Sequence, residues 1–192
     1  MKHAAGLLAR TVSVLALALA IATPATAAAQ SRLEVPVTWS QQPDGTTCGP
    51  TTAKMLLGPL GVSMSVEQLK GPVGYYTSNQ TNRWGMRNGL NQLQSRHTYR
   101  VIEADKMDQG AAKDHLIQAA RDDLRYGVPI ALAINGRMPG YPQSVDHWVA
   151  VAGVDGRSVL VHDPVAQRPG WKNVPASRWL DVSQIPIKAI VM

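Results

Sequence analysis

The chain of 192 residues contains a single cysteine, Cys48, in the polar, turn-forming stretch TTCGPTT. A cysteine nucleophile needs a nearby base, a group that orients the base, and hydrogen-bond donors for the oxyanion. The competing interpretation is an inert, buried thiol that acts as a small hydrophobic side chain. One cysteine cannot form a disulfide within its own chain, and its neighbours here are polar. Together these features favour a reactive thiol.

The segment that follows Cys48 predicts a helix. Pro50 suits the first helical turn, and the pair Gly58-Pro59 supplies a stop. Unpaired N–H groups and the positive end of the helix dipole favour an anion at a helix N-terminus, so a cysteine placed there is stabilised as a thiolate. Apolar residues recur at helical spacing: Ala53, Leu56, Leu57 and Leu60.

The base is sought among five histidines. His3 lies in the N-terminal segment, and His97 and His115 fit ordinary surface positions, which leaves His147 and His162. His147 opens an apolar strand directly after the polar loop GRMPGYPQSVD, so its ring can stand at a sheet edge beside a cleft. A purely structural histidine at the start of that strand is the alternative.

Asp163 ends the next predicted strand and can orient His147 if both side chains lie on one face of the hairpin. A two-residue turn at 155–156 would send the two side chains to opposite faces. A three-residue loop at 154–156, with Gly156 in the left-handed conformation, would place them on the same face. Both loops are chemically plausible. A Cys-His-Asp arrangement therefore requires the odd-numbered loop.

Gln42 stands six positions before Cys48, and its side-chain amide can join the Cys48 backbone N–H in an oxyanion hole. Gln41 is the neighbouring alternative. For either glutamine alone, a solvated loop residue is the more common case.

Periodicity predicts one domain of α+β class at residues 30–192, with a helical part first and an antiparallel sheet last. An extended segment is expected at 33–39, helices at 65–70, 86–94 and 111–127, and strands at 128–134, 147–154, 158–163 and 185–191. The nucleophile at its helix N-terminus is expected to pack against that C-terminal sheet.

Four motifs occur in order between Val35 and Trp179: Q-x5-C-G-P, a strand VPIALAI, the segment DHWVAVAGVDG and the pair D-P in VLVHDP. They resemble those of the bacteriocin-processing, double-glycine type of cysteine peptidase, family thirty-nine of the cysteine peptidases in the papain superfamily. The resemblance implies a papain-like fold and a peptide or protein substrate, with no metal or cofactor. It also implies catalytic roles for four residues: Gln42, Cys48, His147 and Asp163.

Specificity for Gly-Gly does not carry over with this resemblance. Family members that mature bacteriocins are usually fused to an exporter with membrane helices and an ATPase, and neither is recognised in this sequence. The loop TSNQTNRWGMRNG contains no motif that indicates a substrate.

The first 29 residues combine Lys2 and Arg10, an apolar run of about a dozen residues and a small-residue stretch, which is typical of a secretory signal peptide. We therefore expect a secreted or periplasmic protein without a membrane anchor after signal cleavage. Beyond residue 29 the charge is +4, from 17 basic and 13 acidic residues. The basic residues are scattered singly, which gives little support to nucleic-acid binding. A monomer is expected.

Three functions fit these features. The first is an exported cysteine peptidase that uses a Cys-His-Asp triad and a glutamine oxyanion donor. The second is a cell-wall amidase with the same Cys-His chemistry, although such enzymes usually place the histidine closer to the cysteine. The third is a non-catalytic peptide-binding domain on the same fold.

Overall fold

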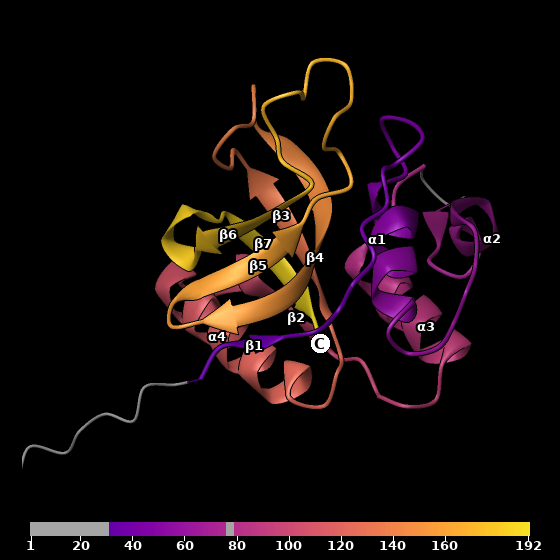
Figure 1. The fold of residues 1–192 in the computed structure, drawn as a ribbon, viewed down its shortest axis with the longest axis horizontal. Helices are drawn as coiled ribbons and strands as arrows, with labels where there is room; N and C mark the ends of the chain where they lie inside the picture. Colours follow the sequence, from indigo (N-terminus) through magenta and orange to yellow (C-terminus); the bar gives the residue numbers. More distant parts are fainter. Residues whose placement is uncertain (1–30, 76–78) are drawn as a thin grey trace, which may run out of the picture.

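The computed structural model describes residues 31–75 and 79–192. The predicted signal peptide, residues 1–29, lies outside the described residues. Four helices and seven strands are assigned in the described part (Figure 1). The helices are α1 (Cys48–Leu57), α2 (Val66–Lys70), α3 (Arg83–Leu93) and α4 (Gln109–Leu124). The strands are β1 (Leu33–Glu34), β2 (Val101–Ile102), β3 (Ile130–Gly136), β4 (Val145–Asp155), β5 (Ser158–His162), β6 (Ser177–Asp181) and β7 (Ile187–Val191).

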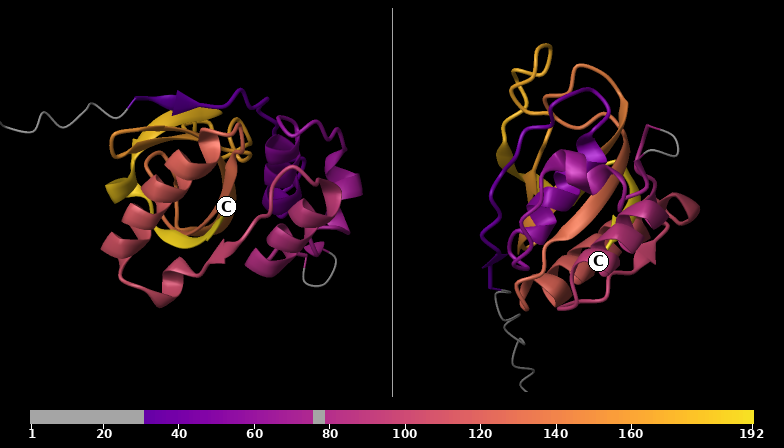
Figure 2. Two further views of the ribbon diagram at one scale, coloured as in Figure 1. Left: turned by 90° about the horizontal axis from the view of Figure 1, so that it is seen from below. Right: turned by 90° about the vertical axis from the view of Figure 1, so that its right-hand side faces the viewer.

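The strands form one antiparallel sheet in the order β2-β7-β3-β4-β5-β6, and β1 pairs with β4. The sheet is strongly curled, with α4 on one face and α1, α2 and α3 together beyond the other (Figures 1 and 2). The central strands β3 and β4 are therefore buried on both faces, which explains why they read as continuous apolar runs in the sequence.

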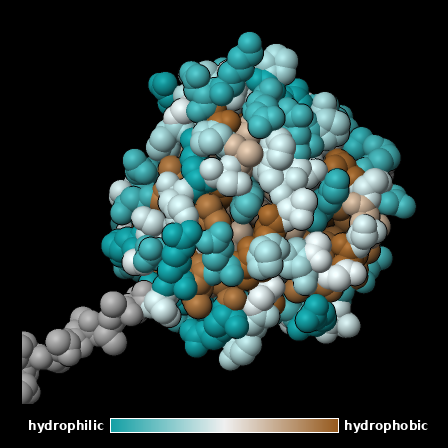
Figure 3. All heavy atoms as spheres, in the orientation of Figure 1, coloured by the Kyte–Doolittle hydropathy of each residue, from teal (hydrophilic) through white to brown (hydrophobic). Residues whose placement is uncertain are grey.

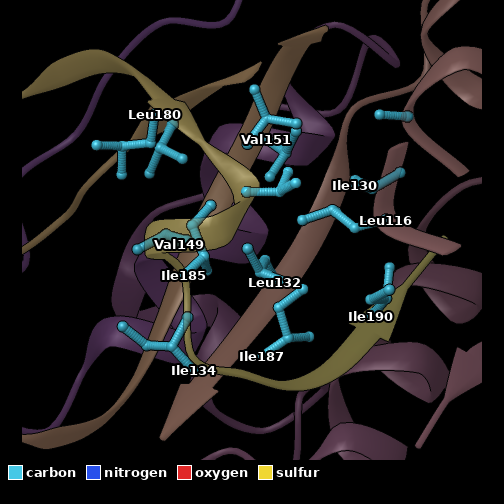
Figure 4. Packing of buried hydrophobic residues seen from close by; sticks show 14 of the residues in the cluster. Leu116, Ile130, Leu132, Ile134, Val149, Val151, Leu180, Ile185, Ile187 and Ile190 are labelled. Carbon is cyan, nitrogen blue, oxygen red and sulfur yellow. The ribbon is translucent and has the colours of Figure 1, made fainter. Parts of the chain in front are cut away.

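Two hydrophobic cores lie on the two faces of the sheet. The first packs α4 against the sheet, with Leu116 of the helix near Ile130, Leu132 and Ile190 of the strands (Figure 4). The second packs α1 and α3 against the other face, where Leu56, Met86 and Trp148 belong to one buried cluster. Alternate residues of β3 and β4 enter opposite cores, as the two-residue period of a strand requires.

The helices match the predicted pattern, although α3 and α4 begin before the expected residues. Asn82 caps α3 by accepting a hydrogen bond from the Gly85 N–H, and Asp108 caps α4 by accepting from Gly110 and Ala111. Asn and Asp are favourable N-cap residues, and each lies a few positions before the start that apolar periodicity predicts. Helix α1 ends at Leu57, yet Leu60 is still buried with the other predicted apolar residues.

Strand β6 was not predicted. Its sequence, SRWLD, is short and lacks a clear alternation, so pairing with β5 rather than local preference makes it a strand. Strands β3 and β4 extend to Gly136 and back to Val145, beyond the predicted bounds, because they pair with each other over seven consecutive positions.

The predicted register of the β4–β5 hairpin is wrong in both of its forms. Asp155 pairs with Ser158, so the loop has two residues, Gly156 and Arg157, and is not odd-numbered. Gly156 has a φ of +55°, a conformation that glycine adopts without strain. His147 and Asp163 nevertheless lie on the same face of the hairpin because of a second feature, a β-bulge in β4.

The bulge leaves Ala152 as an extra residue in β4, since Val151 pairs with Val161 and Gly153 with Leu160. An extra residue reverses the alternation of side chains on one side of the bulge. Without it, the register at the turn would set Asp163 on the face opposite to His147. The bulge therefore returns the two side chains to one face.

Charged and polar residues cover much of the face seen in Figure 3, with hydrophobic atoms visible between them. Among the residues that the structure describes, no helix is both long enough and apolar enough to cross a membrane.

Candidate active site

Cys48 is the first residue of α1, and the cap residue before it is Thr47. The loop that leads into the helix is braced by Asp44, whose Oδ1 accepts hydrogen bonds from the backbone N–H groups of Thr46 and Thr47 at 2.8 and 2.9 Å. Partial burial opposes ionisation of this carboxyl, but the hydrogen bonds from Thr46 and Thr47 outweigh it and lower the pKa of Asp44. The half-buried free thiol is thus held at a helix N-terminus, as the sequence predicted.

His147 lies near the start of β4 and is 6% exposed. Its Nε2 is 3.0 Å from Oδ1 of Asp163, a residue that is fully buried just after β5. Cys48 lines the same cavity as His147 and acts electrostatically on the ring, and because Nε2 is directed at Asp163, Nδ1 is the nitrogen left for the sulfur. The structure therefore brings three of the four predicted site residues together.

The protonation state of His147 follows from its two neighbours. Burial lowers the pKa of the imidazole, but the hydrogen bonds to Asp163 and Cys48, together with the negative charges of both groups, raise the pKa to about 10. At neutral pH the ring is then an imidazolium between a carboxylate and the sulfur. An adjacent cation of this kind stabilises a thiolate, the reactive form of a cysteine.

Asp163 is embedded in further polar contacts. Tyr141, in the loop between β3 and β4, donates its hydroxyl to Oδ2 of Asp163 at 2.7 Å, and Nη2 of Arg178 lies 3.7 Å from the same oxygen. The backbone N–H of Val165 donates to Oδ1 at 3.1 Å, and the indole of Trp39 donates to the backbone carbonyl of Asp163 at 2.8 Å. A fully buried carboxylate requires such compensation.

The fourth predicted residue, Gln42, is 3% exposed, and within the described residues its side chain makes no hydrogen bond to Cys48. Its Nε2 donates to the backbone carbonyl of Asp44 at 2.6 Å, which uses one of the two protons on that nitrogen. The backbone N–H of Gln42 donates to the carbonyl of Pro164 at 2.8 Å, so this segment is tied to the residue directly after Asp163. Gln41 is exposed and donates to the carbonyl of Ala166 at 3.1 Å.

The other described histidines lie elsewhere. His115 is exposed on α4, as predicted. His97 is only half-exposed, and its Nε2 lies 3.5 Å from Oδ2 of Asp123. His162 is buried and its Nδ1 is 2.8 Å from the hydroxyl of Ser177, while burial lowers the pKa of its imidazole.

A cavity of about 220 Å³ opens beside Cys48 and His147, between the start of the helical layer and the sheet. Its charged groups form ion pairs at the rim, where Arg83 contacts Asp105 and Lys188 contacts Asp146. The indole of Trp148 lines this cavity and donates to the carbonyl of Thr81 at 2.7 Å, which ties the sheet to the helical layer. The lining residues are Gly45, Thr46, Cys48, Gln80, Thr81, Asn82, Arg83, Ala133, Asp146, His147, Trp148 and Lys188.

The model of the Peptidase_C39 like family matches residues 33–185, which is most of the chain. This chain belongs to the Peptidase_C39 like family. A search of curated protein sequences found no match.

Solved structures of C39 peptidases share the fold. The peptidase domain of Streptococcus ComA, described as a bi-functional ABC transporter involved in a quorum sensing pathway, is 17% identical with a TM-score of 0.55, over 82% of this chain and 97% of that domain. A putative C39-like peptidase from Bacillus anthracis is 13% identical with a TM-score of 0.57, over 84% and 97% of the two chains. A double glycine motif protease from an AMS/PCAT transporter, solved with a leader peptide, is 12% identical with a TM-score of 0.52, over 85% and 97%.

The predicted family and the α+β papain-like fold are thereby confirmed. This member of the C39 peptidase-like family has the fold of a peptidase, and at these low identities the likeness to the solved structures concerns the fold. Several further residues of the site are not among the predicted ones. Trp148 carried a signal, since it directly follows His147, whereas Tyr141, Arg178 and Lys188 come from loops and strands in which no motif singles them out.

Proposed function

We propose that this protein is an exported cysteine peptidase in which Cys48 is the nucleophile, His147 the base and acid, and Asp163 the orienting group. The observation that carries the proposal is the arrangement of His147, whose Nε2 is 3.0 Å from Oδ1 of Asp163 and which lines one cavity together with Cys48. A nucleophile, a base in contact with it and a group that orients the base are the parts that acyl transfer by a thiol requires.

In the acylation step, the Cys48 thiolate attacks the carbonyl carbon of a peptide bond and forms a carbon–sulfur bond. His147 then gives its proton to the departing amine nitrogen as the carbon–nitrogen bond breaks. In the second step the neutral imidazole takes a proton from water, the resulting nucleophile attacks the thioester, and the Cys48 thiolate is released with a carboxylic acid product. Asp163 holds the ring in one orientation throughout.

The oxyanion is assigned to the backbone N–H of Cys48 and the side chain of Gln42. Cys48 opens α1, so its N–H has no partner within the helix. Gln42 is buried, and Nε2 retains a second proton after donating to Asp44, so the amide can donate to a developing negative charge.

The substrate is proposed to be a peptide or protein, because the double glycine motif protease from an AMS/PCAT transporter was solved with a leader peptide. The substrate chain is proposed to bind in the cavity of about 220 Å³ next to Cys48 and His147. The rim ion pairs, Arg83 with Asp105 and Lys188 with Asp146, present both charges to the substrate.

Export is proposed from the signal-like segment at residues 1–29. Mass spectrometry of the protein recovered from the periplasm or the medium should give an N-terminus near Gln30. An intact Met1 on protein that stays with the cytoplasmic fraction would contradict export.

The deciding experiment is digestion of a peptide library by residues 30–192, compared with the Cys48→Ala variant, with peptidoglycan fragments as a second substrate set. We expect cleavage of peptides by the wild type and none by Cys48→Ala. Gln42→Ala should lose about 10² to 10³ in turnover, the usual loss for one oxyanion donor, while Cys48 is still alkylated by iodoacetamide at the wild-type rate.

His147→Ala should abolish cleavage and slow the alkylation of Cys48 at pH 6, because the thiolate loses its cationic partner. Asp163→Asn should be milder, because an amide oxygen can still accept from the imidazole. Cleavage of peptidoglycan fragments alone would identify an amidase. If Cys48 of the wild type is alkylated slowly at pH 6 and His147→Ala does not change this rate, the protein would instead be a non-catalytic peptide-binding domain.

A further inference from the structure

The carboxylate of Asp163 lies between two cations. Its Oδ1 accepts from Nε2 of His147 at 3.0 Å and from the Val165 N–H at 3.1 Å. Its Oδ2 accepts from the hydroxyl of Tyr141 at 2.7 Å, and Nη2 of Arg178 lies 3.7 Å from this oxygen, beyond hydrogen-bond distance. Asp163 is fully buried, so water does not weaken these contacts.

Arg178 has unmet hydrogen-bonding capacity on the side that faces this carboxylate. Its Nη1 donates to the carbonyl of Pro139 at 2.6 Å, whereas the buried Nε and Nη2 make no hydrogen bond within the described residues. A guanidinium normally gains strong, charge-assisted hydrogen bonds to a carboxylate, and buried donors without partners are costly. Arg178 is therefore a second cation that attracts the Asp163 carboxylate, through Oδ2 rather than through the Oδ1 that His147 contacts.

Tyr141 occupies the oxygen that Arg178 would otherwise take. The side chain is 1% exposed, and its ring packs edge-on against Trp171 with the ring centres 5.0 Å apart. Burial and the neighbouring charge of Asp163 raise the pKa of the Tyr141 hydroxyl, so it stays protonated and acts as a donor. The guanidinium of Arg178 sits 5.7 Å from the centre of the same ring, which keeps it beside the carboxylate without a direct hydrogen bond.

We propose that Tyr141 is a positioning residue of this site, whose hydroxyl holds the Asp163 carboxylate toward His147 against the pull of Arg178. The inference rests on the proposed function, because it concerns the aspartate of the same triad. Tyr141 acts through Asp163, because within the described residues its hydroxyl bonds that carboxylate and makes no hydrogen bond to Cys48 or His147.

The test begins with Tyr141→Phe, which keeps the ring and its packing but removes the hydroxyl. The carboxylate is then free to turn to Arg178, and the hydrogen bond to His147 weakens. We expect the His147 pKa, measured by NMR titration of the imidazole, to fall by about one unit, and kcat for peptide cleavage to fall roughly tenfold with KM unchanged.

Tyr99→Phe is the matched control. Tyr99 is also 1% exposed, and its hydroxyl donates to the carbonyl of Pro129 at 3.0 Å, away from the site. Both variants lose one buried tyrosine hydrogen bond. Thermal unfolding should show a lower stability for each variant. The His147 titration and kcat/KM should change only in Tyr141→Phe.

A second substitution at Arg178 distinguishes a positioning role of Tyr141 from a merely structural one. Arg178→Gln removes the competing cation and keeps a donor for Pro139, so adding it to Tyr141→Phe should restore the His147 pKa and most of the lost activity. Arg178→Met serves the same purpose if the glutamine variant does not fold.

Equal His147 titrations in Tyr141→Phe and the wild type, or no recovery in either double variant, would overturn the role of Tyr141. A wild-type His147 that titrates near 6.5 would instead count against the triad, and so against the proposed function. The NMR readout needs no substrate, so the two failures are distinguishable.

Discussion

His147 lies between two groups that both favour its protonated form, and this is the central feature at the scale of single residues. Burial alone would lower the pKa of the imidazole, yet contacts with Asp163 and Cys48 raise it to about 10. Because Asp163 and Cys48 each raise the pKa of His147, the protonation state of His147 depends on both residues. Cys48 and His147 should therefore be perturbed together by any variant of either residue.

The Cys48→Ala variant tests this coupling without a substrate. Removing the sulfur removes one hydrogen bond and one negative charge, both of which raise the His147 pKa, so the imidazole should lose its proton at a lower pH than in the wild type. NMR titration of the ring measures the change. His162, whose pKa is lowered by burial, should titrate as in the wild type and is the internal control.

If the His147 titration were the same in Cys48→Ala and the wild type, the sulfur and the imidazole would not be in electrostatic contact.

The raised pKa of His147 also affects how activity depends on pH. His147 must carry a proton to act as the acid for the leaving amine, so the alkaline limb of kcat/KM should lie well above pH 6.5, toward about 10.

At the scale of elements, the site depends on how closely α1 approaches its neighbours. Gly49, directly after Cys48, faces Thr81 of the loop before α3, and a Cβ on Gly49 would lie 2.4 Å from the Thr81 Cβ. The carbonyl of Thr81 in turn accepts from the indole of Trp148 on β4. The start of α1, this loop and the sheet are thus in contact at the cavity beside Cys48.

Gly49→Ala should therefore force α1 away from Thr81. We expect a loss of about 1 to 3 kcal/mol in the free energy of unfolding, the usual cost of overpacking, together with a changed rate of Cys48 alkylation. Thermal or urea unfolding measures the first effect. Thr81→Gly removes the clashing Cβ and should recover much of the loss when combined with Gly49→Ala.

Gly45→Ala is the matched control, in the loop before α1. No atom lies within 4 Å of an added Cβ at Gly45, so this alanine should change the free energy of unfolding little. A Gly49→Ala protein as stable as Gly45→Ala would show that the close approach of α1 to Thr81 is not required.

At the scale of the whole molecule, one sheet separates two hydrophobic cores, and the site lies where the helical layer of α1 meets the sheet. The core formed with α4 is on the other face (Figure 2). A variant in that distant core should lower stability without changing the electrostatics of His147.

Leu116→Ala in α4 tests this separation. The side chain is fully buried, and its truncation should cost about 2 to 5 kcal/mol in the free energy of unfolding. Below the unfolding transition, the NMR titration of His147 should match the wild type. His115→Ala, one residue earlier and exposed, should change neither property. A shifted His147 titration in Leu116→Ala would mean that the two faces of the sheet are coupled.

Local patterns in the sequence predict most of the helices and strands of the fold. The apolar spacing after Cys48 identified α1, and the continuous apolar runs identified β3, β4, β5 and β7, because burial on one helical face or both sheet faces leaves a direct trace in residue type. The motifs around Gln42, Cys48, His147 and Asp163 pointed to the C39 peptidase-like family, which the family model confirms.

Tertiary structure decided what no local pattern encodes. The bulge at Ala152, not the length of the hairpin loop, returns His147 and Asp163 to one face, because register depends on pairing with β5 rather than on the turn residues alone. Tyr141 and Arg178 meet Asp163 from segments 22 and 15 positions away in the sequence. A buried carboxylate must be compensated, but which side chains do so is determined only when loops and strands distant along the chain pack together.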